Sequence, residues 1–557
     1  MNSKLRHISH HFSGTASEEF AVKIVRWSWV VLVISSIFQC IFFQSLENFV
    51  AVGCVLIVWS VVTNVFLRSS TLKNFPLSTF LLLGFSSTQF YFPLLFTLLE
   101  GKPIVFNLEL PFEVFFHSMA AFFVLVLVHI FYQILSEKWA KGTSSLFERA
   151  GFFAPPSDLQ LWIMGIIGVA STYYVWLYSP SVGWSPTGAA EDKVVQALIP
   201  FSYAPYFIPF GRLYGRNAVT TKRLLIMLAT FTLILFLVSI ARNSRSGFML
   251  GFASVGFAYG LGALLNYFKP RFFTLRNSFI AAIIFWLFTG PIADIGTAMA
   301  MVRGQRLDIP YSELIELTLE AFNDKDAIRV RRLADNTEKQ DWDEIYMDNI
   351  FIQRFSNLKY NDASLVMAAK LGDYDTDLLN FTIDHFLSTL PLPVLEFLGL
   401  NVNKEMINSN SYGDYFYYQV TASPWVLEAF RTGHFAGTGM ATFGWWYLLI
   451  LAIGIFPVYV LFDKLAIREY KNTSSVIMNN SNVRFSFCGL LSLTSIFQFL
   501  PFESVEVIGS FFLRGWIQMV LLYFLFYHFT RLISTFIQGD GSSMQVKRSR
   551  LYTIKKI

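Results

Sequence analysis

Two arginines stand three residues apart in the segment "ARNSRSG" (residues 241–247), which separates two strongly apolar stretches of the chain. A guanidinium group is permanently charged and can bind two phosphate oxygens through parallel hydrogen bonds. Arg242 and Arg245 are accompanied by an asparagine and two serines, which can donate further hydrogen bonds. A helix starting here would also direct free backbone N–H groups at a bound anion. The segment therefore predicts an anion clamp. The alternative is that each arginine only reaches lipid headgroups or caps the preceding helix.

Three further arginines could bind the same anion. Arg303 and Arg306 lie in "MVRGQR", directly after an apolar stretch, and Arg354 lies in "IFIQRFSN" among apolar neighbours. Arginines on protein surfaces rarely stand between large apolar side chains, so Arg354 is the most informative of the three. Two interpretations stay open for it: a phosphate ligand, or an arginine that extends from a small apolar core of its own segment.

A histidine occupies the glycine-rich segment "EAFRTGHFAGTGMATFGWW", which leads into an apolar stretch. Imidazole titrates near neutral pH, so His434 is a candidate general base or hydrogen-bond donor, against the alternative of an ordinary interfacial histidine. The glycines do not form a nucleotide-binding loop, because no strand precedes them and no lysine occupies the required position. We expect them to let the backbone turn sharply.

One segment imitates a calcium-binding loop. "DYDTDLLNFTID" places Asp373, Asp375, Asp377 and Asp384 at positions 1, 3, 5 and 12 of that pattern. Leu378 occupies position 6, where the turn requires glycine, and position 12 is Asp where the pattern has Glu. Helix capping and solvation explain these aspartates better, and neither a metal site nor a cofactor is predicted.

The composition is that of a membrane protein. Hydrophobic residues make up 54% of the 557 residues, charged residues only 15%, and Phe occurs 60 times; soluble domains carry roughly a quarter charged residues. Apolar runs of about 20 residues, each sufficient to cross a bilayer as a helix, recur about twelve times. The predicted spans are 27–44, 48–67, 75–98, 113–135, 159–178, 193–210, 222–240, 246–267, 278–298, 440–462, 485–503 and 508–530.

Basic residues alternate between the connecting segments, which predicts the orientation. The terminal segments and every second connection are rich in Lys and Arg, whereas the others, such as "SLEN" and "FESVEV", are poor in them. Both termini are therefore expected in the cytoplasm, and the "ARNSRSG" hairpin on the outer side. Residues 303–431 contain 21 acidic and 12 basic residues. Their apolar patches predict a folded, largely helical cap that lies on the membrane.

Four parts follow from this pattern: nine N-terminal membrane helices (1–298), a large outer loop (299–439), three C-terminal membrane helices (440–535) and a basic tail (536–557). Gly256 and Gly260 predict close helix packing in the eighth span. The three cysteines, Cys40, Cys54 and Cys488, lie in apolar runs and are expected to be small core residues.

This layout resembles that of the Wzy-type O-antigen polymerases. The likeness lies in the outer hairpin "RNSRSG", in the large outer loop carrying "RFSN", and in "GTGMATFGWWYL", which is similar to that family's glycine-rich approach to a late helix. The resemblance implies an all-α, GT-C-like, metal-independent glycosyltransferase of the bacterial inner membrane. Its substrates would be oligosaccharide repeat units on undecaprenyl pyrophosphate, joined on the periplasmic side. Membrane lipids and a chain-length regulator are the expected partners, and no nucleic acid is.

In such an enzyme, Arg242, Arg245 and Arg354, joined by Arg303 and Arg306, would hold the pyrophosphate as it leaves. His434 would activate the acceptor hydroxyl, with a loop carboxylate as its rival. Two alternatives stay open. The related O-antigen ligases usually carry a His–Asn pair, but Phe435 follows His434 here. A flippase or secondary transporter would place ionisable groups within the membrane, where only His117 and His129 of the fourth span stand out.

Overall fold

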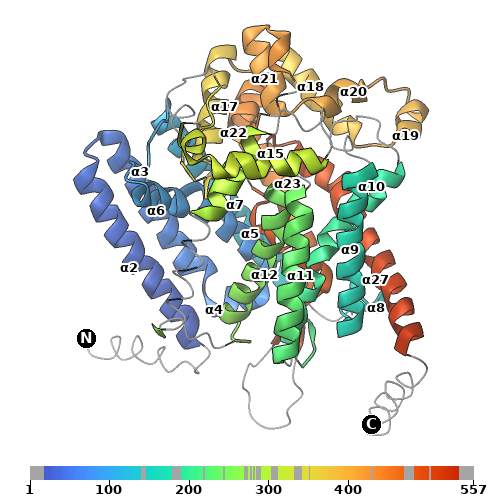
Figure 1. Cartoon of the computed structure of the whole chain (residues 1–557). Coiled ribbons are helices and arrows are strands. Elements are labelled where there is room, and N and C mark those ends of the chain that lie inside the picture. Colours follow the sequence, from blue (N-terminus) through green and yellow to red (C-terminus); the bar gives the residue numbers. More distant parts are fainter. Residues whose placement is uncertain are drawn as a thin grey trace, which may run out of the picture.

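The computed structural model is mostly helical. It describes residues 18–139, 146–178, 190–217, 220–241, 245–268, 274–275, 279, 283, 286, 290–302, 311–330, 342–349, 352–427, 429, 431–469, 482–500 and 503–538. Long helices form the body of the molecule, and shorter helices cover one end of it (Figure 1). Among the described helices, the first begins and the last ends at the opposite end of this body.

Six helical segments of the described residues are long and apolar enough to cross a membrane. Several are built from consecutive helices that continue through a π-helical or 3₁₀ turn. They are α2 (Glu18–Phe42); α3 (Leu46–Val61) with η2 (Val62–Phe66); α5 (Pro76–Ser86), η3 (Ser87–Tyr91) and α6 (Phe92–Leu99); α7 (Pro111–Trp139); α22 (Phe435–Phe443), η8 (Gly444–Trp446) and α23 (Tyr447–Asp463); and α26 (Val507–Ser510), η9 (Phe511–Gly515) and α27 (Trp516–Gln538). The chain is thus a multi-pass helical membrane protein.

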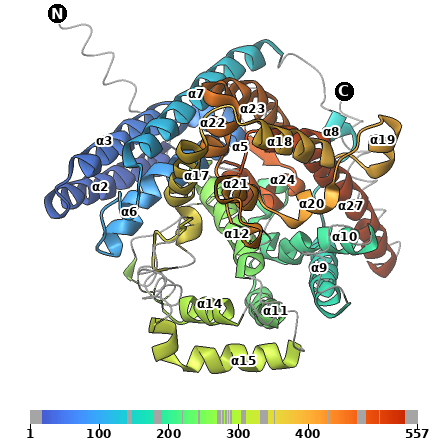
Figure 2. The ribbon, with the colours of Figure 1, turned by 90° about the horizontal axis from the view of Figure 1, so that it is seen from above.

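The structure does not support the twelve predicted spans. Three predicted spans coincide with α9 (Asp158–Tyr178), α11 (Lys222–Ala241) and α12 (Arg245–Leu264), which do not count among the six. The predicted span 278–298 falls largely outside the described residues. It overlaps α14 (Pro291–Met301), which α15 (Tyr311–Asn323) follows at the edge of the molecule (Figure 2).

Two predicted spans are not continuous α-helices. Residues 193–210 contain the end of α10 (Ala190–Ala197) and much of η4 (Ile199–Tyr214), a 3₁₀ helix with Pro205 and Pro209 inside it. Proline lacks the backbone N–H that an α-helix needs, which explains this departure. The described residues of 485–503 contain two short helices, α24 (Phe487–Leu491) and α25 (Leu493–Phe497).

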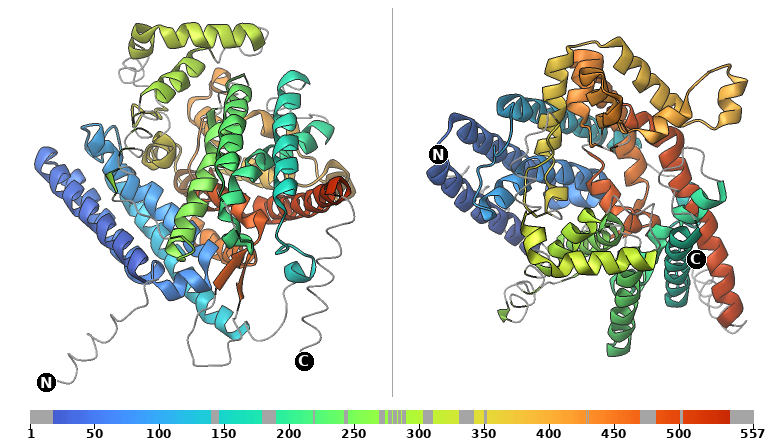
Figure 3. Two further views of the ribbon diagram at one scale, coloured as in Figure 1. Left: turned by 60° about the horizontal axis from the view of Figure 1, so that its bottom comes forward. Right: turned by 45° about the horizontal axis from the view of Figure 1, so that its top comes forward.

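Short elements complete the connections on the side away from the cap. They are α4 (Ser69–Asn74), α8 (Leu146–Arg149) and the antiparallel strands β1 (Ala466–Glu469) and β2 (Asn482–Phe485), whose ribbon appears in Figure 3. Ala466 of β1 pairs with Phe485 of β2.

The described residues of 342–431 fold into a helical cap with a small core of its own. Its helices are α17 (Leu358–Leu371), α18 (Thr376–Ser388), α19 (Leu392–Phe397), α20 (Lys404–Ser409) and α21 (Tyr412–Thr421), with the turns η6 (Gln353–Phe355) and η7 (Pro424–Val426). Met367, Leu378, Phe416 and Val426 are buried in this core. Asp375 caps α18 by accepting a 2.7 Å hydrogen bond from the backbone N–H of Leu378. The capping interpretation of this aspartate is confirmed.

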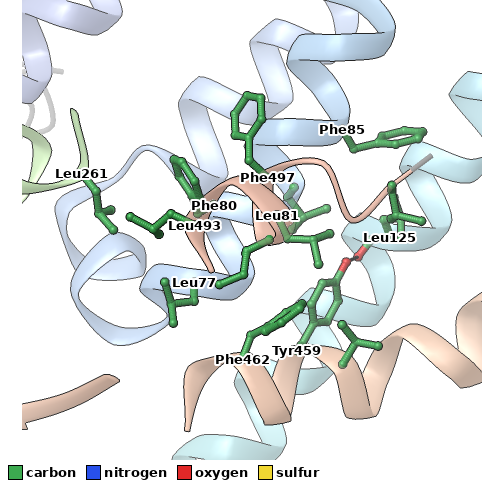
Figure 4. Packing of buried hydrophobic residues seen from close by; sticks show 14 of the residues in the cluster. Leu77, Phe80, Leu81, Phe85, Leu125, Leu261, Tyr459, Phe462, Leu493 and Phe497 are labelled. Atoms are coloured by element: carbon green, nitrogen blue, oxygen red, sulfur yellow. Dashed lines mark hydrogen bonds between the residues drawn. The ribbon is translucent and has the colours of Figure 1, made fainter. Parts of the chain in front are cut away.

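The core of the membrane helices is rich in aromatic rings. Phe80 and Phe497 lie 5.2 Å apart, and Tyr459 donates a 3.2 Å hydrogen bond to the carbonyl of Leu125 (Figure 4). Gly84 lets α5 approach α25 closely, because a Cβ at this position would lie 1.9 Å from the carbonyl oxygen of Phe497.

Gly256 and Gly260 behave differently from the prediction. A Cβ at either position would meet no atom of the described residues within 4 Å, so close packing at this pair finds no support there. Instead, Gly251 of the same helix lies against the ring of Tyr203 and Gly262 against that of Phe268.

Candidate functional site

The chain leaves the cap and re-enters the membrane body at His434, which caps the N-terminus of α22. Its Nδ1 accepts a hydrogen bond of 3.3 Å from the backbone N–H of Ala436, and the side chain is only 1% exposed. Burial, assisted by the nearby charge of His117, lowers the pKa of His434 to about 3. The ring is therefore neutral at physiological pH.

The second ring nitrogen of His434 faces a membrane helix. Nε2 lies 3.3 Å from the side-chain nitrogen of Gln89, which is fully buried in η3. A neutral ring that accepts at Nδ1 carries its proton on Nε2, and this N–H requires an acceptor. The amide oxygen of Gln89 has no partner among the described residues. Because an amide's O and N are assigned from the hydrogen-bond network, we place that oxygen against Nε2. Both nitrogens of His434 are then engaged.

Glu503 lies beside this segment, between α25 and α26. Its Oε2 accepts a 3.0 Å hydrogen bond from the backbone N–H of Tyr412, and its carbonyl accepts one of 2.8 Å from the hydroxyl of Thr438 in α22. Burial raises the pKa of Glu503 to about 7, against the hydrogen bond from Tyr412, which lowers it. A carboxyl with this pKa can accept or release a proton near neutral pH.

Glu344 approaches the same segment from the cap. Its Oε1 accepts hydrogen bonds from the backbone N–H of Thr432 at 2.7 Å and from the indole of Trp342 at 3.1 Å. Burial raises the pKa of Glu344, and the charges of Arg354 and Arg431 partly offset this. The negative charge of Glu344 in turn raises the pKa of Glu503. Two carboxyl groups therefore influence each other beside Thr432 and His434.

Arg354 supplies an exposed positive charge at the junction between the cap and the membrane body. Its backbone carbonyl accepts a 3.4 Å hydrogen bond from the side chain of Gln498, at the end of α25. The neighbouring Ile352 and Phe355 pack against the core of the membrane helices, and the ring of Phe355 meets that of Phe92 edge-on. These apolar neighbours of Arg354 are not part of the small core of the cap. The backbone of Arg354 is held against the membrane body while its side chain stays exposed.

Arg431 is close in sequence to His434 but is committed to the cap. Its guanidinium donates to Oδ1 of Asp414 at 3.2 Å and to the carbonyl of Val426 at 2.6 Å, and it lies over the ring of Tyr417. Asp414 is completely buried. Arg431 therefore compensates a buried carboxylate and is not a candidate for binding a substrate anion.

Not every predicted site residue falls in the described part of the chain. Arg242, Arg303 and Arg306 lie outside the described residues. Arg245 is the first residue of α12, and its side chain is likewise outside them. Arg354 and His434 are described, and both lie at the junction of the cap with the membrane body.

The carboxylates Glu344 and Glu503 were not predicted as site residues. Glu503 lies in "PFES", one of the connections that the sequence marks only as poor in basic residues. A carboxylate between two apolar stretches is the signal that could have identified it. Glu344 lies in the acidic loop, where its sequence context does not distinguish it from twenty other acidic residues.

A second polar cluster lies between membrane helices, near the end away from the cap, and it contains a serine, a histidine and an aspartate. Ser78 donates to Asp463 at 2.5 Å and lies 2.9 Å from Nε2 of His129. A hydrolytic triad needs the aspartate to orient the histidine, but Nδ1 of His129 contacts Gln133. Asp463 instead accepts hydrogen bonds from the backbone N–H groups of Leu77 and Ser78. It caps α5, so this cluster joins helices and is not a nucleophilic site.

Comparisons with known proteins leave the family open, since no family model, no curated protein and no solved structure matches this chain. Within the described ranges, no three His, Cys, Asp or Glu side chains are grouped so that they could hold a metal ion.

Proposed function

We propose that this protein is a membrane glycosyltransferase of the polymerase type. It would transfer an oligosaccharide chain from one isoprenoid pyrophosphate carrier to the repeat unit on another. The observation that supports the proposal best is the position of Glu503. A carboxyl group with a pKa of about 7 lies at the junction of the cap and the membrane body, and the exposed cation Arg354 lies at the same junction, where its charge acts on the neighbouring Glu344. A lipid-linked substrate would present its pyrophosphate at the membrane surface, so charge for it is needed there.

In the proposed reaction, the carboxylate of Glu503 takes the proton of an acceptor hydroxyl, as general base catalysis requires. The hydroxyl oxygen then bonds to the anomeric carbon of the donor sugar, and the bond from that carbon to the pyrophosphate breaks. The electron pair leaves with the pyrophosphate. Arg354, with Arg242, Arg245, Arg303 and Arg306 as further candidates, would stabilise the developing negative charge.

His434 remains a predicted catalytic residue, but its surroundings suit another role in the same reaction. A neutral imidazole with both nitrogens engaged, as described above, offers no free lone pair to an acceptor hydroxyl. We assign it to positioning: it fixes the start of α22, and Thr438 of this helix holds the backbone of Glu503. The general base would then be Glu503, which lies outside the large outer loop from which the rival carboxylate was expected.

The proposal includes a location and an orientation. The protein would reside in the bacterial inner membrane with the cap in the periplasm and both termini in the cytoplasm, as the distribution of basic residues predicts. A GT-C-like arrangement of the membrane helices is part of the same proposal.

Transport is the second candidate function. The observation in its favour is the buried cluster of Ser78, His129 and Asp463. Ionisable groups between membrane helices often serve the movement of protons or ions. Asp463, however, is the last residue of α23 and caps the first turn of α5. The cluster therefore has a structural explanation that does not require transport.

The decisive experiment follows the length of the surface polysaccharide in cells that carry single substitutions. Glu503→Gln and Arg354→Ala should leave single repeat units attached to the lipid core and remove the longer products, at unchanged protein levels. Arg354→Lys should recover only part of the length, because Lys cannot bind phosphate with two parallel bonds. Lys370→Ala, an exposed position in the cap, is the matched control and should keep the full ladder.

Each other outcome has a distinct meaning. Loss of all attached sugar would indicate a ligase or a flippase. A full ladder from both Glu503→Gln and Arg354→Ala would reject the proposed site.

A further inference from the structure

The helix α19 exposes an unusual amount of apolar surface for its length. Phe397 is 88% exposed, and Leu392 and Leu398 are each 53% exposed, whereas Leu395 between them is buried. Between Thr389 and Asn403 the chain carries a single charged residue, Glu396. A group of large, exposed apolar side chains on one short segment marks an interaction surface.

Residues 390–404 form a hairpin, in which α19 is followed by a return segment, and hydrogen bonds fix its turn and its base. The backbone N–H of Leu400 donates a 2.9 Å hydrogen bond to the carbonyl of Leu395, and Gly399 adopts a positive φ of 67° to make this turn. At the base of the hairpin, the ammonium group of Lys404 donates to the carbonyl of Leu390. Leu395 and Val402 face inward, Val402 against the core of the cap. The exposed apolar residues are therefore presented by a defined structure.

The preceding helix places this hairpin at the level of a membrane boundary. The ring of Phe386 in α18 packs against Gly509 of α26, where a Cβ would lie 2.5 Å from the ring. Gly509 is near the start of the last spanning segment, Val507–Gln538. Only the link between Ser388 and Leu392 separates α18 from α19. The hairpin therefore begins beside the point where the last membrane helix starts.

The hairpin lies at the lateral edge of the molecule. Seen from above, α19 lies at the rim of the molecule, beyond α18 and on the same side as α27 (Figure 2). In Figure 1 it projects sideways from the cap, above the outer face of the membrane helices. A segment in this position would face the lipid that surrounds the membrane helices.

We propose that the hairpin of residues 390–404 inserts its apolar side chains into the membrane leaflet on the cap side, and so anchors the cap to lipid. The absence of basic residues between Thr389 and Asn403 means that insertion depends on apolar contact and not on attraction to anionic headgroups. Insertion should therefore occur in uncharged lipid and be insensitive to salt. This proposal is independent of the proposed catalytic function.

The test measures the depth of a probe on the full-length protein in phosphatidylcholine nanodiscs. Cys40, Cys54 and Cys488 are first replaced, and an environment-sensitive fluorophore is attached to Phe397→Cys or, as the matched control, to the exposed Asn401→Cys. The probe at position 397 should be quenched severalfold more strongly by lipids carrying a nitroxide near the headgroup than the probe at 401. Aqueous iodide should show the opposite preference.

Equal quenching by iodide at both positions would overturn the proposal. Leu398→Cys provides a second labelling site on the same exposed surface and should repeat the result at 397. Oxidation of unlabelled Phe397→Cys tests whether a second copy of the chain covers this surface. Efficient formation of a disulfide-linked dimer would show that it does, and would overturn insertion into lipid.

Discussion

The backbone N–H of Tyr412 donates a 3.0 Å hydrogen bond to Oε2 of Glu503, although the two residues are 91 positions apart in the chain. The hydroxyl of the same tyrosine donates to Oε1 of Glu506 at 3.1 Å, and His385 lies 2.7 Å from that oxygen. The start of α21 in the cap is thus tied to two carboxylates in the connection before the last membrane helix. Any movement of the cap relative to that helix would change the surroundings of Glu503.

The reaction rate should depend on the protonation of Glu503. The carboxylate is the basic form, and its fraction rises tenfold per pH unit below a pKa of about 7 and then levels off. The rate of polymer formation, measured with purified enzyme and lipid-linked oligosaccharide, should rise with pH and reach a plateau above about 7. A rate that is flat between about pH 5 and 8 would exclude Glu503 as the base, since it would point to a group that titrates outside this range.

The same pKa predicts that Glu503→Gln stabilises the protein at high pH while it abolishes activity. The folded-state pKa of about 7 lies above the ordinary value of 4.5 because burial disfavours the charged form. The protonated carboxyl thus contributes stability that is fully present below 4.5 and is lost as the pH rises through about 7. Glutamine imitates the protonated form, so the variant should unfold at a higher temperature than the wild type at about pH 8 and at a similar temperature at about pH 4. A lower unfolding temperature for Glu503→Gln at high pH would contradict this cause of the shift.

His434 should act by positioning and not as the base. Asparagine is a favourable N-cap, so His434→Asn should keep the start of α22 and retain a measurable rate whose pH dependence still has its midpoint near 7. His434→Ala should lose about 1 kcal/mol of capping, in addition to the cost of the cavity it leaves. The rates of purified His434→Asn and Glu503→Gln should be compared directly. Equal and complete inactivity of two well-folded variants would support His434 as the base.

The buried pair of Arg431 and Asp414 predicts a large effect on stability. Arg431→Met leaves the fully buried carboxylate of Asp414 without its countercharge and should destabilise the protein by about 3–5 kcal/mol. Adding Asp414→Asn removes the uncompensated charge, so the double variant should recover a substantial part of this loss. Thermal unfolding of the two single variants and the double variant in detergent measures the coupling. Additive effects would show that the two side chains do not compensate each other.

Two helical glycines should respond in opposite ways to the same substitution. A Cβ on Gly437 would lie 2.2 Å from the backbone of Ser364, where α22 crosses α17, so Gly437→Ala should cost about 1–3 kcal/mol or displace the helix. Gly53 of α3 is the matched control, because a Cβ there meets no described atom within 4 Å. Gly53→Ala should be neutral or stabilise by up to about 1 kcal/mol. Equal unfolding temperatures for both variants would argue against the close helix crossing.

Features that depend on local chemistry could be predicted from the order of the residues. Long apolar runs specify membrane helices such as α2 and α7, because a helix satisfies its own backbone hydrogen bonds within lipid. Asp375 could be recognised as a helix cap, since its partner Leu378 is only three residues away. The prolines within residues 193–210 are also a local feature, and they explain why the structure forms a 3₁₀ helix there and not the continuous span that we predicted.

Which residues share a site depends on how the helices pack in three dimensions. His434 meets Gln89 across 345 positions of sequence, and Glu503 meets Tyr412 across 91. No periodicity of the chain encodes such distances, because they follow from how helices cross and how closely their backbones approach. The spacing of Gly256 and Gly260 indicated a close contact, yet the described structure shows close approaches at other glycines, Gly84 and Gly437 among them. The raised pKa of Glu503 also arises from burial under the cap, which composition does not reveal.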